Sequence, residues 1–472
     1  MNLTSILKLL GECPLVVSVQ APEGSPLRDD STLVRLALAS ANEGVRLLRA
    51  EGPSSLQAIA RSTGLPVMGL IKRTYEGSPV YITPTLAEVE EVLSAGCRVV
   101  AVDGTGRPRP REESLSDLVR AIHQAGAIAV GDCDTLDSIR HAVECGVDLV
   151  STTLAGYTAP GTPRGPDIEL VRRAVREFAV PVLAEGRFQE PWEVQAALRS
   201  GAAGVVIGGA INDPIKQTKR FLGALPFQGG RVGAVDLGGT WLRCGLFTSG
   251  WELLESDRAP TPPDPQERLI WIRSRLEDWG VVRAGVSSGG VIDPQGGRVV
   301  RAKDIIPRHV GSEFSQATLG VPTLAANDGH ASAYAHACLP ENAGRRVATL
   351  ALGTGVGFGL VERGNLWRGP SGEPPGFNDV EFRQGRTYED VLGGASRASG
   401  SEGDAGEVEA AFDSLVELCQ RLFLPDRIYV CGSVGLAMSR ESPAVRSPFG
   451  EFAGLYGAAA LALYTPTDWS VN

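Results

Sequence analysis

Short β-branched runs alternate with helical segments through residues 1–225. Each run ends in a polar residue or a glycine, and the segment after it carries apolar residues at helical spacing, as in 86–93 and 118–123. Eight such strand–helix units predict an α/β fold, a (β/α)8 TIM barrel, whose chemistry lies at the C-terminal ends of the strands. The candidate site residues at or near these ends are Gln20, Arg49, Lys72, Asp103, Asp132, Thr152, Glu185 and Gly208.

The second half of the chain follows a different pattern. Residues 233–248 contain an apolar run that ends in Asp236, a turn through Gly238 and Gly239, and an alternating strand, which together predict a β-hairpin. A third strand, a helix and a buried strand that opens into a glycine-rich loop follow at 251–256, 265–278 and 282–293. Three hairpin-forming strands followed by helix–strand alternation indicate an actin-like, ribonuclease-H-like fold of two lobes.

Length and composition fit two full-sized globular domains. The chain has 472 residues, of which 43% are hydrophobic and 21% charged, as in ordinary soluble proteins. The Gly- and Pro-containing segment 221–231 places the boundary near residue 228, between domains 1–228 and 229–472. The net charge of −10 disfavours non-specific binding to nucleic acid or to an anionic membrane.

The cysteine pattern and the N-terminus predict a cytoplasmic protein. The 8 cysteines are scattered without C-x-C or C-x-x-C spacing, as expected of buried thiols in a reducing compartment. The N-terminus lacks a basic segment followed by a long apolar run, and no apolar run approaches membrane-spanning length.

Several strand ends of the barrel carry chemical signals. Lys72 follows a continuous apolar strand, at a barrel mouth where desolvation and neighbouring cations would lower its pKa and suit it to act as a general base. Glu185 ends a later strand, and Gly186 after it can offer its backbone N–H to an anion. Gly208 and Gly209 end the eighth strand, where this fold often binds phosphate. Taken alone, Lys72 could instead be a surface lysine and Glu185 a structural carboxylate.

Five strings of the first half are distinctive enough to compare with known families. The longest is Ile-Lys-Arg-Thr-Tyr-Glu-Gly-Ser-Pro-Val-Tyr-Ile-Thr-Pro-Thr at 71–85. The others are Val-Ser-Val-Gln-Ala at 17–21, Arg-Pro-Arg-Pro at 107–110, Thr-Thr-Leu-Ala-Gly-Tyr-Thr at 152–158 and Ala-Glu-Gly-Arg at 184–187. With these strings the half resembles the N-acetylmannosamine-6-phosphate 2-epimerase family along nearly its whole length. The resemblance implies proton chemistry at C2 of a ring-opened amino-sugar phosphate, with no metal and no nucleotide.

The resemblance also implies a role for each matching residue. Lys72 would remove and return the C2 proton, and Glu185 would transfer a proton on the carbonyl-oxygen side. Gln20, Arg49 and Asp132 match positions that hold the sugar in that family. With them, the expected substrate-binding residues include Gly186, Arg187, Gly208 and Gly209.

One position departs from that family. Its eighth-strand loop usually ends in Ile-Thr-Arg-Pro, where the arginine binds phosphate, whereas this chain has Ile-Asn-Asp-Pro at 211–214. Asp213 stands in the arginine position, and a carboxylate there repels phosphate. Either Arg187, Lys216 or Lys219 substitutes for the arginine, or the barrel binds its substrate weakly.

Two glycine-rich hairpin tips in the second half are candidate phosphate loops. In the first, Asp-Leu-Gly-Gly-Thr at 236–240, backbone N–H groups can approach phosphate and the carboxylate could hold Mg²⁺ with its waters. The second is Gly-Thr-Gly at 353–355, and a later strand ends in Gly432, which suits adenosine contact. Each glycine run alone fits a plain turn, but the ordered pair could grip the phosphates of ATP from both sides. The expected ATP and Mg²⁺ residues are Asp236, Gly238, Gly239, Thr240, Gly353, Thr354, Gly355 and Gly432.

Asp328 is the candidate catalytic base of this half. A kinase needs a carboxylate within hydrogen-bond reach of the acceptor hydroxyl, to take its proton. Asp328 lies where the apolar strand 321–325 gives way to an alanine-rich helix, so as an isolated residue it could also be a helix N-cap. The Asp-x-Gly-Gly-Thr-x-x-Arg string at 236–243 resembles the first phosphate loop of the ROK sugar-kinase family, which includes N-acetylmannosamine kinases. The sugar-contact positions that the resemblance implies are Ser288, Gly289, Asn327, Asp328, Glu373 and Glu389.

The zinc motif of the ROK family is missing. That family often carries Gly-Glu-x-Gly-His followed by a cysteine cluster, whereas residues 372–380 read Gly-Glu-Pro-Pro-Gly-Phe-Asn-Asp-Val and the next cysteine is Cys419. Without the imidazole and the thiolates, we expect no structural zinc. The histidine would also touch the sugar, so Phe377 could pack in its place, and the sugar specificity stays open.

The two implied activities are consecutive. The kinase would form N-acetylmannosamine 6-phosphate from N-acetylmannosamine and ATP, and the epimerase would convert it to N-acetylglucosamine 6-phosphate, as in the breakdown of sialic acid. The expected partners are amino sugars, their 6-phosphates and ATP, with a homo-oligomer expected by analogy. Three alternatives stay open: a kinase for glucose or another hexose, a barrel that only binds phosphosugar, and a non-catalytic sugar sensor.

Overall fold

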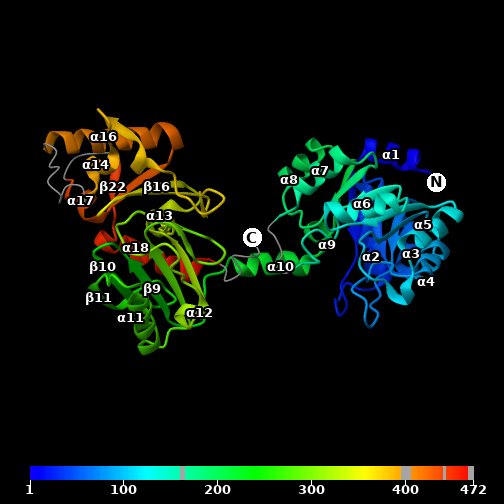
Figure 1. The fold of residues 1–472 in the computed structure, drawn as a ribbon, viewed down its shortest axis with the longest axis horizontal. Helices are drawn as coiled ribbons and strands as arrows, with labels where there is room; N and C mark the ends of the chain where they lie inside the picture. The colour runs from blue at the N-terminus through cyan, green and yellow to red at the C-terminus, as the bar shows by residue number, and fades with distance from the viewer. Residues whose placement is uncertain (160–164, 395–404, 439–442, 466–472) are drawn as a thin grey trace. The chain divides into compact units, whose positions relative to one another are not determined.

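The computed structural model describes residues 1–159, 165–394, 405–438 and 443–465. The chain divides into two compact units, the first formed by residues 1–222 and the second starting at Gly223 (Figure 1). Helix α10 (Pro214–Gly223) ends at this division and buries none of its residues. None of the helices in the described ranges is long and apolar enough to cross a membrane.

The first unit is a closed barrel of eight parallel strands, which confirms the predicted fold. In order around the barrel these are β1 (Leu15–Val19), β2 (Leu47–Glu51), β3 (Val67–Leu70), β4 (Val99–Asp103), β5 (Ile128–Asp132), β6 (Leu149–Ser151), β7 (Val182–Glu185) and β8 (Gly204–Ile207). Pairing of Val16 with Val206 joins β1 to β8 and closes the barrel. Each strand ends within one or two residues of the position that the sequence predicts.

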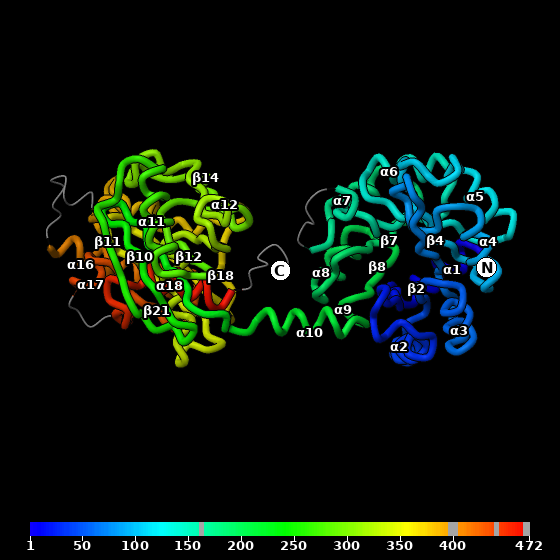
Figure 2. The backbone as a smooth tube through the Cα atoms, turned by 90° about the horizontal axis from the view of Figure 1, so that it is seen from below, coloured from blue at the N-terminus to red at the C-terminus, as the bar shows by residue number. Residues whose placement is uncertain are grey.

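Helices surround the barrel strands, as the tube in Figure 2 shows. They are α2 (Asp30–Asn42), α3 (Pro53–Thr63), α4 (Leu86–Ser94), α5 (Leu115–Gln124), α6 (Leu136–Glu144), α7 (Ile168–Glu177) and α8 (Pro191–Arg199), with α1 (Leu3–Glu12) before β1 and α9 (Gly209–Asn212) after β8. Several helices begin at side-chain caps, because the oxygens of Asp29, Ser114 and Thr135 accept backbone N–H groups of the first turn. The strands are apolar on both faces because one face fills the barrel and the other packs under these helices.

The second unit contains two five-stranded sheets. The first sheet has the order β11 (Leu253–Pro260), β10 (Trp241–Phe247), β9 (Val232–Leu237), β12 (Arg283–Ser288) and β15 (Thr323–Asn327). The second has the order β18 (Asn365–Leu366), β17 (Val356–Glu362), β16 (Arg346–Leu352), β21 (Arg427–Cys431) and β22 (Ala444–Arg446). In each sheet an antiparallel hairpin continues into parallel strands, which confirms the predicted two-lobed fold.

The remaining elements of this unit cover and connect the two sheets. The helices are α11 (Pro265–Asp278), α12 (Gln316–Leu319), α13 (Asp328–Ala337), α14 (Tyr388–Leu392), α16 (Ala405–Phe423), α17 (Gly432–Ala437) and α18 (Ala453–Tyr464). Two small hairpins are formed by β13 (Val291–Ile292) with β14 (Val299–Arg301) and by β19 (Glu381–Arg383) with β20 (Arg386–Thr387).

Helices α13 and α18 lie side by side in the middle of this unit (Figure 1). Their backbones touch, because a Cβ added to Gly457 would lie 2.0 Å from the carbonyl oxygen of Ala331. Helix α18 approaches β12 just as closely, since a Cβ on Gly285 would lie 1.8 Å from the carbonyl oxygen of Ala458. Small residues therefore lock α13, which begins at Asp328, against the first sheet.

Candidate functional site

A buried ion pair lies at the mouth of the barrel. Arg49, inside β2 and only 1% exposed, donates from Nη1 to Asp132 Oδ1 at 3.0 Å and from Nη2 to Asp132 Oδ2 at 2.6 Å. The same Nη1 lies 3.2 Å from Oε2 of Glu185. The bidentate contact with Asp132 and the contact with Glu185 join β2, β5 and β7 and bring three of the predicted site residues together.

Two hydroxyl groups that the sequence analysis did not single out complete this cluster. Thr153 Oγ1 lies 2.6 Å from Asp132 Oδ1 and 3.0 Å from Glu185 Oε2, and Ser151 Oγ donates to Glu185 Oε2 at 3.2 Å. Burial raises the pKa of Glu185; the Asp132 charge adds to the rise, while Arg49 and the two hydroxyls oppose it. Ser151 and Thr153 lie at the end of β6, and this position in the sequence is the signal that could have identified them as site residues.

Lys72 follows β3 and pairs with Ile82 through one isolated backbone bridge. Its side chain keeps exposed surface in the open mouth, yet the surrounding barrel wall desolvates the amine and lowers its pKa. The Arg49 charge lowers this pKa further, and carboxylates that include Glu185 oppose the shift. Lys72 therefore belongs to the same electrostatic cluster as the buried ion pair.

Two more predicted residues lie at neighbouring strand ends. Gln20 follows β1, and its Nε2 donates to Ser18 Oγ at 2.9 Å. Gly186 follows β7 with φ at 109°, a backbone conformation that glycine adopts without strain. Its backbone can therefore turn sharply beside Glu185.

Arg187 is engaged by protein groups around its own loop. Its guanidinium donates to the carbonyl oxygens of Ala155 and Gly165, the latter at 2.7 Å. It also lies over the ring of Tyr157, with 5.5 Å from the guanidinium carbon to the ring centre. These contacts hold the side chain in place, so a new phosphate contact would have to compete with them.

The loop after β8 places a lysine beside the predicted phosphate glycines. A Cβ added to Gly209, which follows Gly208 at the start of α9, would lie 2.9 Å from Nζ of Lys216. Asp213 Oδ1 accepts the backbone N–H of Lys216 at 3.1 Å, which caps the first turn of α10. Asp213 Oδ2 lies 3.9 Å from Lys216 Nζ. The carboxylate in the arginine position is thus bound to a helix start and partly neutralised.

We expect Arg49→Met to destabilise the barrel, because it leaves the buried Asp132 carboxylate without its cation. Removing one partner of a buried ion pair costs about 3–5 kcal/mol. Hydrogen exchange followed by mass spectrometry should show faster exchange in β2 and β5, with the strands of the second unit as internal control. Unchanged protection in β2 and β5 would contradict this role of the pair.

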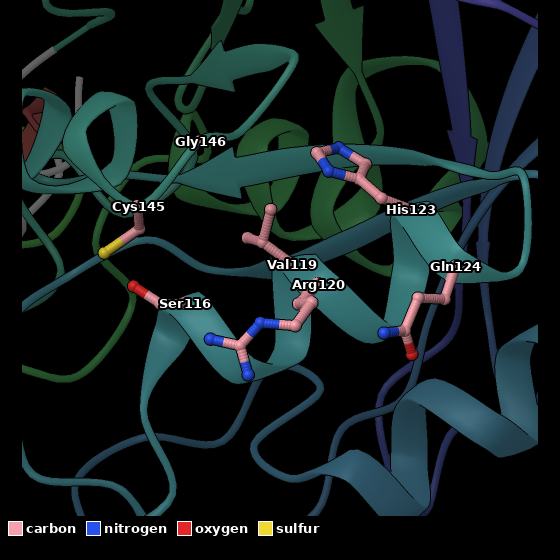
Figure 3. A pocket seen from close by; sticks show the side chains of 7 residues that line it. All are labelled: Ser116, Val119, Arg120, His123, Gln124, Cys145 and Gly146. Carbon is pink, nitrogen blue, oxygen red and sulfur yellow. The ribbon is translucent and has the colours of Figure 1, made fainter.

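A separate pocket of about 510 Å³ lies on the outside of the barrel, between α5 and the end of α6 (Figure 3). It is lined by Ser116, Val119, Arg120, His123, Gln124, Cys145 and Gly146. None of the predicted site residues lines it. The pocket is therefore distinct from the strand-end cluster.

The first glycine tip of the second unit carries a half-buried carboxylate. Asp236 Oδ1 accepts the Ser287 hydroxyl at 3.0 Å, and Asp236 Oδ2 lies 3.4 Å from Nη1 of Arg243. Burial raises the pKa of Asp236, and Arg243 and Ser287 oppose the rise. Gly238 and Gly239 form the turn between β9 and β10, and Thr240 after them is exposed.

The second glycine tip, 353–355, joins β16 to β17 in the same way. The Gly353 N–H donates to the Gly355 carbonyl at 3.0 Å, which closes the turn around Thr354. Gly432 begins α17 with φ at 83°, and a Cβ there would lie 2.3 Å from the carbonyl oxygen of Leu352. Glycine is required at Gly432 because the α17 start touches the base of this tip.

Asp328 is the first residue of α13, and its Oδ1 accepts the N–H of Gly329 at 2.8 Å. The helix N-cap is Asn327, whose Oδ1 accepts the same N–H at 3.0 Å, so a capping role for Asp328 is wrong. Burial raises the pKa of Asp328 to about 6, and the charges of Asp236 and Glu389 contribute to the rise. The carboxylate uses Oδ1 for the Gly329 N–H, and its raised pKa makes it a better proton acceptor than an ordinary aspartate.

The other predicted sugar-contact residues occupy different surroundings. Asn327 Nδ2 donates to the carbonyl oxygen of Gly290 at 2.8 Å, which ties α13 to the loop after β12. Ser288 is fully buried at the end of β12, and Gly289 after it is half-buried. The loop backbone at Gly289 therefore keeps partial solvent exposure, whereas the serine hydroxyl is buried.

The two predicted glutamates bind different backbone groups. Glu389 Oε2 accepts the Val356 N–H at 2.8 Å, directly behind the second glycine tip, and burial raises its pKa. Glu373 folds back on its own turn, where its Oε2 accepts the Ser371 N–H at 2.9 Å. Only Glu389 is thus drawn into the electrostatic group of Asp328.

Phe377, in the segment where the ROK family carries its zinc motif, is a core residue. The Phe377 ring is buried and packs edge-on against Phe358, with 4.6 Å between ring centres. Its ring therefore serves the core of the second lobe. Within the described ranges, no three His, Cys, Asp or Glu side chains gather as metal ligands.

Comparisons with known proteins match both halves of the chain. The NanE family model, described as "Putative N-acetylmannosamine-6-phosphate epimerase", matches residues 33–226, and the ROK family model matches residues 232–377. A relative from Brucella melitensis, named bifunctional enzyme NanE/NanK, is 33% identical over 505 residues, which cover 95% of this chain and 96% of the relative.

Two solved structures resemble one half each. The N-acetylmannosamine-6-phosphate 2-epimerase from Clostridium perfringens is 39% identical, with a TM-score of 0.46, and the match covers 47% of this chain and 97% of that chain. A ROK family glucokinase from Streptomyces griseus is 21% identical, with a TM-score of 0.40, and the match covers 49% of this chain and 99% of that chain.

Proposed function

Because this chain belongs to the family of bifunctional NanE/NanK enzymes, we propose that it phosphorylates N-acetylmannosamine and then epimerises the product. The kinase domain, residues 229–472, transfers a phosphoryl group from ATP to O6. The barrel domain, residues 1–228, inverts C2 and yields N-acetylglucosamine 6-phosphate. The two reactions share one intermediate, and this supports a joint role in amino-sugar breakdown.

The observation that carries the epimerase proposal is the cluster of Lys72, Arg49, Asp132 and Glu185 at the barrel mouth. Ring opening places C2 next to the C1 aldehyde, so the C2 proton becomes acidic. A lowered pKa keeps more of Lys72 as the neutral amine, which takes that proton from one face of C2; the ammonium so formed then gives a proton back to the other face. The raised pKa of Glu185 suits it to give a proton to the carbonyl oxygen and take it back. Arg49, 3.2 Å from Oε2, stabilises the Glu185 carboxylate that is left when the proton has moved to the carbonyl oxygen.

In the kinase domain we assign Asp328 as the base that accepts the proton of the sugar hydroxyl. With a pKa of about 6 it is ionised at neutral pH and still basic enough to accept a proton. The two glycine tips offer backbone N–H groups to the phosphates of ATP. Asp236 presents carboxylate oxygens beside the first tip, which is the donor type that Mg²⁺ prefers, so this residue fits the ion. Mg²⁺ bound with ATP supplies neutralisation of the phosphate charge.

We assign Lys216 as the cation that replaces the family arginine at the barrel phosphate. Its ammonium already lies over Gly209, whereas Arg187 is engaged by carbonyl oxygens. Lys219 instead lines a shallow groove with Pro26 and Leu27.

Replacing Lys216 by alanine should raise the KM of the epimerase for the phosphosugar about tenfold or more, with a smaller effect on kcat. A hydrogen bond to a charged group is worth about 1.5–3 kcal/mol, and a phosphate far from C2 contributes to binding in both ground and transition states. Initial rates with supplied N-acetylmannosamine 6-phosphate measure the change. Lys216→Arg should restore the KM, and Lys219→Ala is the matched control. An equal rise of KM in both alanine variants would count against Lys216.

One NMR experiment tests the whole proposal. The protein is incubated with N-acetylmannosamine, Mg·ATP and D₂O, and ³¹P and ¹H spectra follow the products. N-acetylglucosamine 6-phosphate with deuterium at C2 is the expected product. Accumulation of N-acetylmannosamine 6-phosphate would reject the epimerase half, with Asp213 as the first residue to replace. Absence of any phosphosugar would reject N-acetylmannosamine as the kinase substrate.

A further inference from the structure

A buried histidine lies beneath the glycine loop that follows β12. His309 is 3% exposed, and its Nε2 lies 2.9 Å from Ser288 Oγ and 3.1 Å from the Gly289 carbonyl oxygen. The sequence motifs did not single out His309, because it stands in a turn with no strand or helix of its own. Its ring nevertheless reaches two consecutive residues of the sugar loop, defined here as Ser288, Gly289 and Gly290.

An equally buried arginine holds the other side of the ring. Arg268, from α11, is 1% exposed, and its Nη1 lies 3.5 Å from His309 Nδ1. Its remaining donors bind the carbonyl oxygens of Pro262, Pro263 and Pro307, at 2.7 Å for Pro262 and 2.9 Å for Pro263. Arg268 thus fixes both the histidine and the backbone just before it.

The donor and acceptor types assign the proton on the histidine ring. A guanidinium has donors only, so Nδ1 must present its lone pair to Arg268 and Nε2 must carry the hydrogen. The Gly289 carbonyl can only accept, which agrees with this assignment. Burial, and after it the Arg268 charge, lower the pKa of His309 to about 4, so the ring is neutral at ordinary pH. His309 therefore donates to the sugar loop across the working range of a kinase.

The segment that carries His309 also touches both phosphate tips. A Cβ on Gly289 would lie 3.6 Å from Ile306 Cδ1. A Cβ on Gly239 would lie 2.6 Å from Ile305 Cγ2, and one on Gly355 would lie 3.4 Å from Ile305 Cδ1. Residues 305–309 therefore connect the sugar loop to the two glycine tips.

We propose that His309, held by Arg268, is a positioning residue that fixes the sugar loop for the acceptor sugar. The inference rests on the proposed kinase function, because it takes the half-buried backbone of Gly289 and Gly290 as the sugar-facing part of the loop. His309 acts through the loop and does not touch the reacting atoms. Its hydrogen bonds hold the backbone in the binding conformation before the sugar arrives, which lowers the cost of ordering the loop.

The test compares two substitutions at this position. His309→Phe keeps an aromatic ring, slightly larger than imidazole, and removes both ring nitrogens, so the loop loses its donor. We expect the KM for N-acetylmannosamine to rise about tenfold, while the KM for ATP changes less than about twofold. His309→Gln can place an amide N–H near the position of Nε2 and should restore most of the sugar affinity. Steady-state kinetics with each substrate varied in turn measure these values.

A matched control separates positioning from general stability. His336 is another fully buried histidine, and it bonds Thr349 at 2.9 Å and Ser447 at 2.8 Å instead of the sugar loop. His336→Phe should lower the Tm without raising the sugar KM relative to the ATP KM. If His309→Phe behaves like His336→Phe, or if His309→Gln folds without restoring the sugar KM, the inference is overturned. Failure of the unaltered chain to phosphorylate N-acetylmannosamine would instead reject the proposed function.

Discussion

Replacing Lys72 by alanine is expected to abolish exchange of the C2 proton with solvent while leaving phosphorylation intact. Loss of a general base lowers a rate by about 10²–10⁴-fold. The measurement is incorporation of deuterium at C2 of supplied N-acetylmannosamine 6-phosphate, followed by ¹H NMR in D₂O.

Lys72→Arg is the informative companion variant. It keeps a positive charge at the barrel mouth but cannot give up its proton near neutral pH. If Lys72 acts as the base, both variants lose exchange; if it acts only through its charge, the arginine variant retains exchange. Deuterium incorporation by the alanine variant at the rate of the unaltered chain would remove Lys72 from the mechanism.

The lowered pKa of Lys72 also predicts the shape of the pH profile. The amine accepts a proton only when neutral, so the epimerase rate should rise with pH and level off below the usual lysine pKa of 10.5. Removing the Arg49 charge should move this rise to higher pH, because that charge helps to lower the pKa of Lys72. A profile that does not move in an Arg49 variant that still folds would contradict the coupling.

Asp328→Asn is expected to lower the rate of phosphorylation about 10³-fold and to leave epimerisation of supplied phosphosugar unchanged. The asparagine amide can still accept the Gly329 N–H through its oxygen, so the start of α13 should keep its structure. Retained ATP binding, measured by calorimetry, shows that the variant is folded. A variant with most of its kinase activity would exclude Asp328 as the base.

The pKa of Asp328 fixes the acid limb of the kinase profile. Because the carboxylate must be ionised to accept a proton, the rate should fall about tenfold per pH unit below a pH of about 6. The epimerase rate also falls toward acid, because Lys72 must be neutral, so the distinguishing feature is the pH at which each profile levels off. Rates of the two half-reactions, measured between pH 4.5 and about 9, provide the comparison.

Mixing the two variants, each inactive in one half-reaction only, adds a further check. Lys72→Ala supplies the kinase and Asp328→Asn supplies the epimerase, so together they should convert N-acetylmannosamine fully to N-acetylglucosamine 6-phosphate. Failure of the mixture, with each remaining half-reaction active alone, would mean that the intermediate does not pass between chains.

Local patterns in the sequence were enough to predict the elements that carry the sites. The eight strands, the two hairpins and the helix at 265–278 follow from apolar periodicity and turn glycines, which act over a few neighbouring residues. The strand ends follow as well, because a buried parallel strand stops where polar residues begin. Lys72, Glu185 and Asp236 could thus be placed at strand ends without knowledge of the fold.

Several site features depended on contacts that local pattern does not encode. Asn327, and not the alternative candidate Asp328, caps α13, because the Asn327 side chain reaches two N–H groups of the first turn. The role of Asp213 as a cap of α10 likewise appears only once that helix is seen to begin at Pro214. In both cases a neighbouring backbone N–H decided what the carboxylate does.

The sequence by itself determined the two folds, their order and the residue types at the strand ends, since these follow from short-range periodicity. Only the tertiary structure decided which of those residues meet. Arg49 and Asp132 are separated by 83 positions, and His309 and Arg268 by 41, so closure of the barrel and packing of α11 bring them together. Because burial strengthens each such contact and shifts the pKa of the groups involved, the chemistry of both sites depends on that long-range packing.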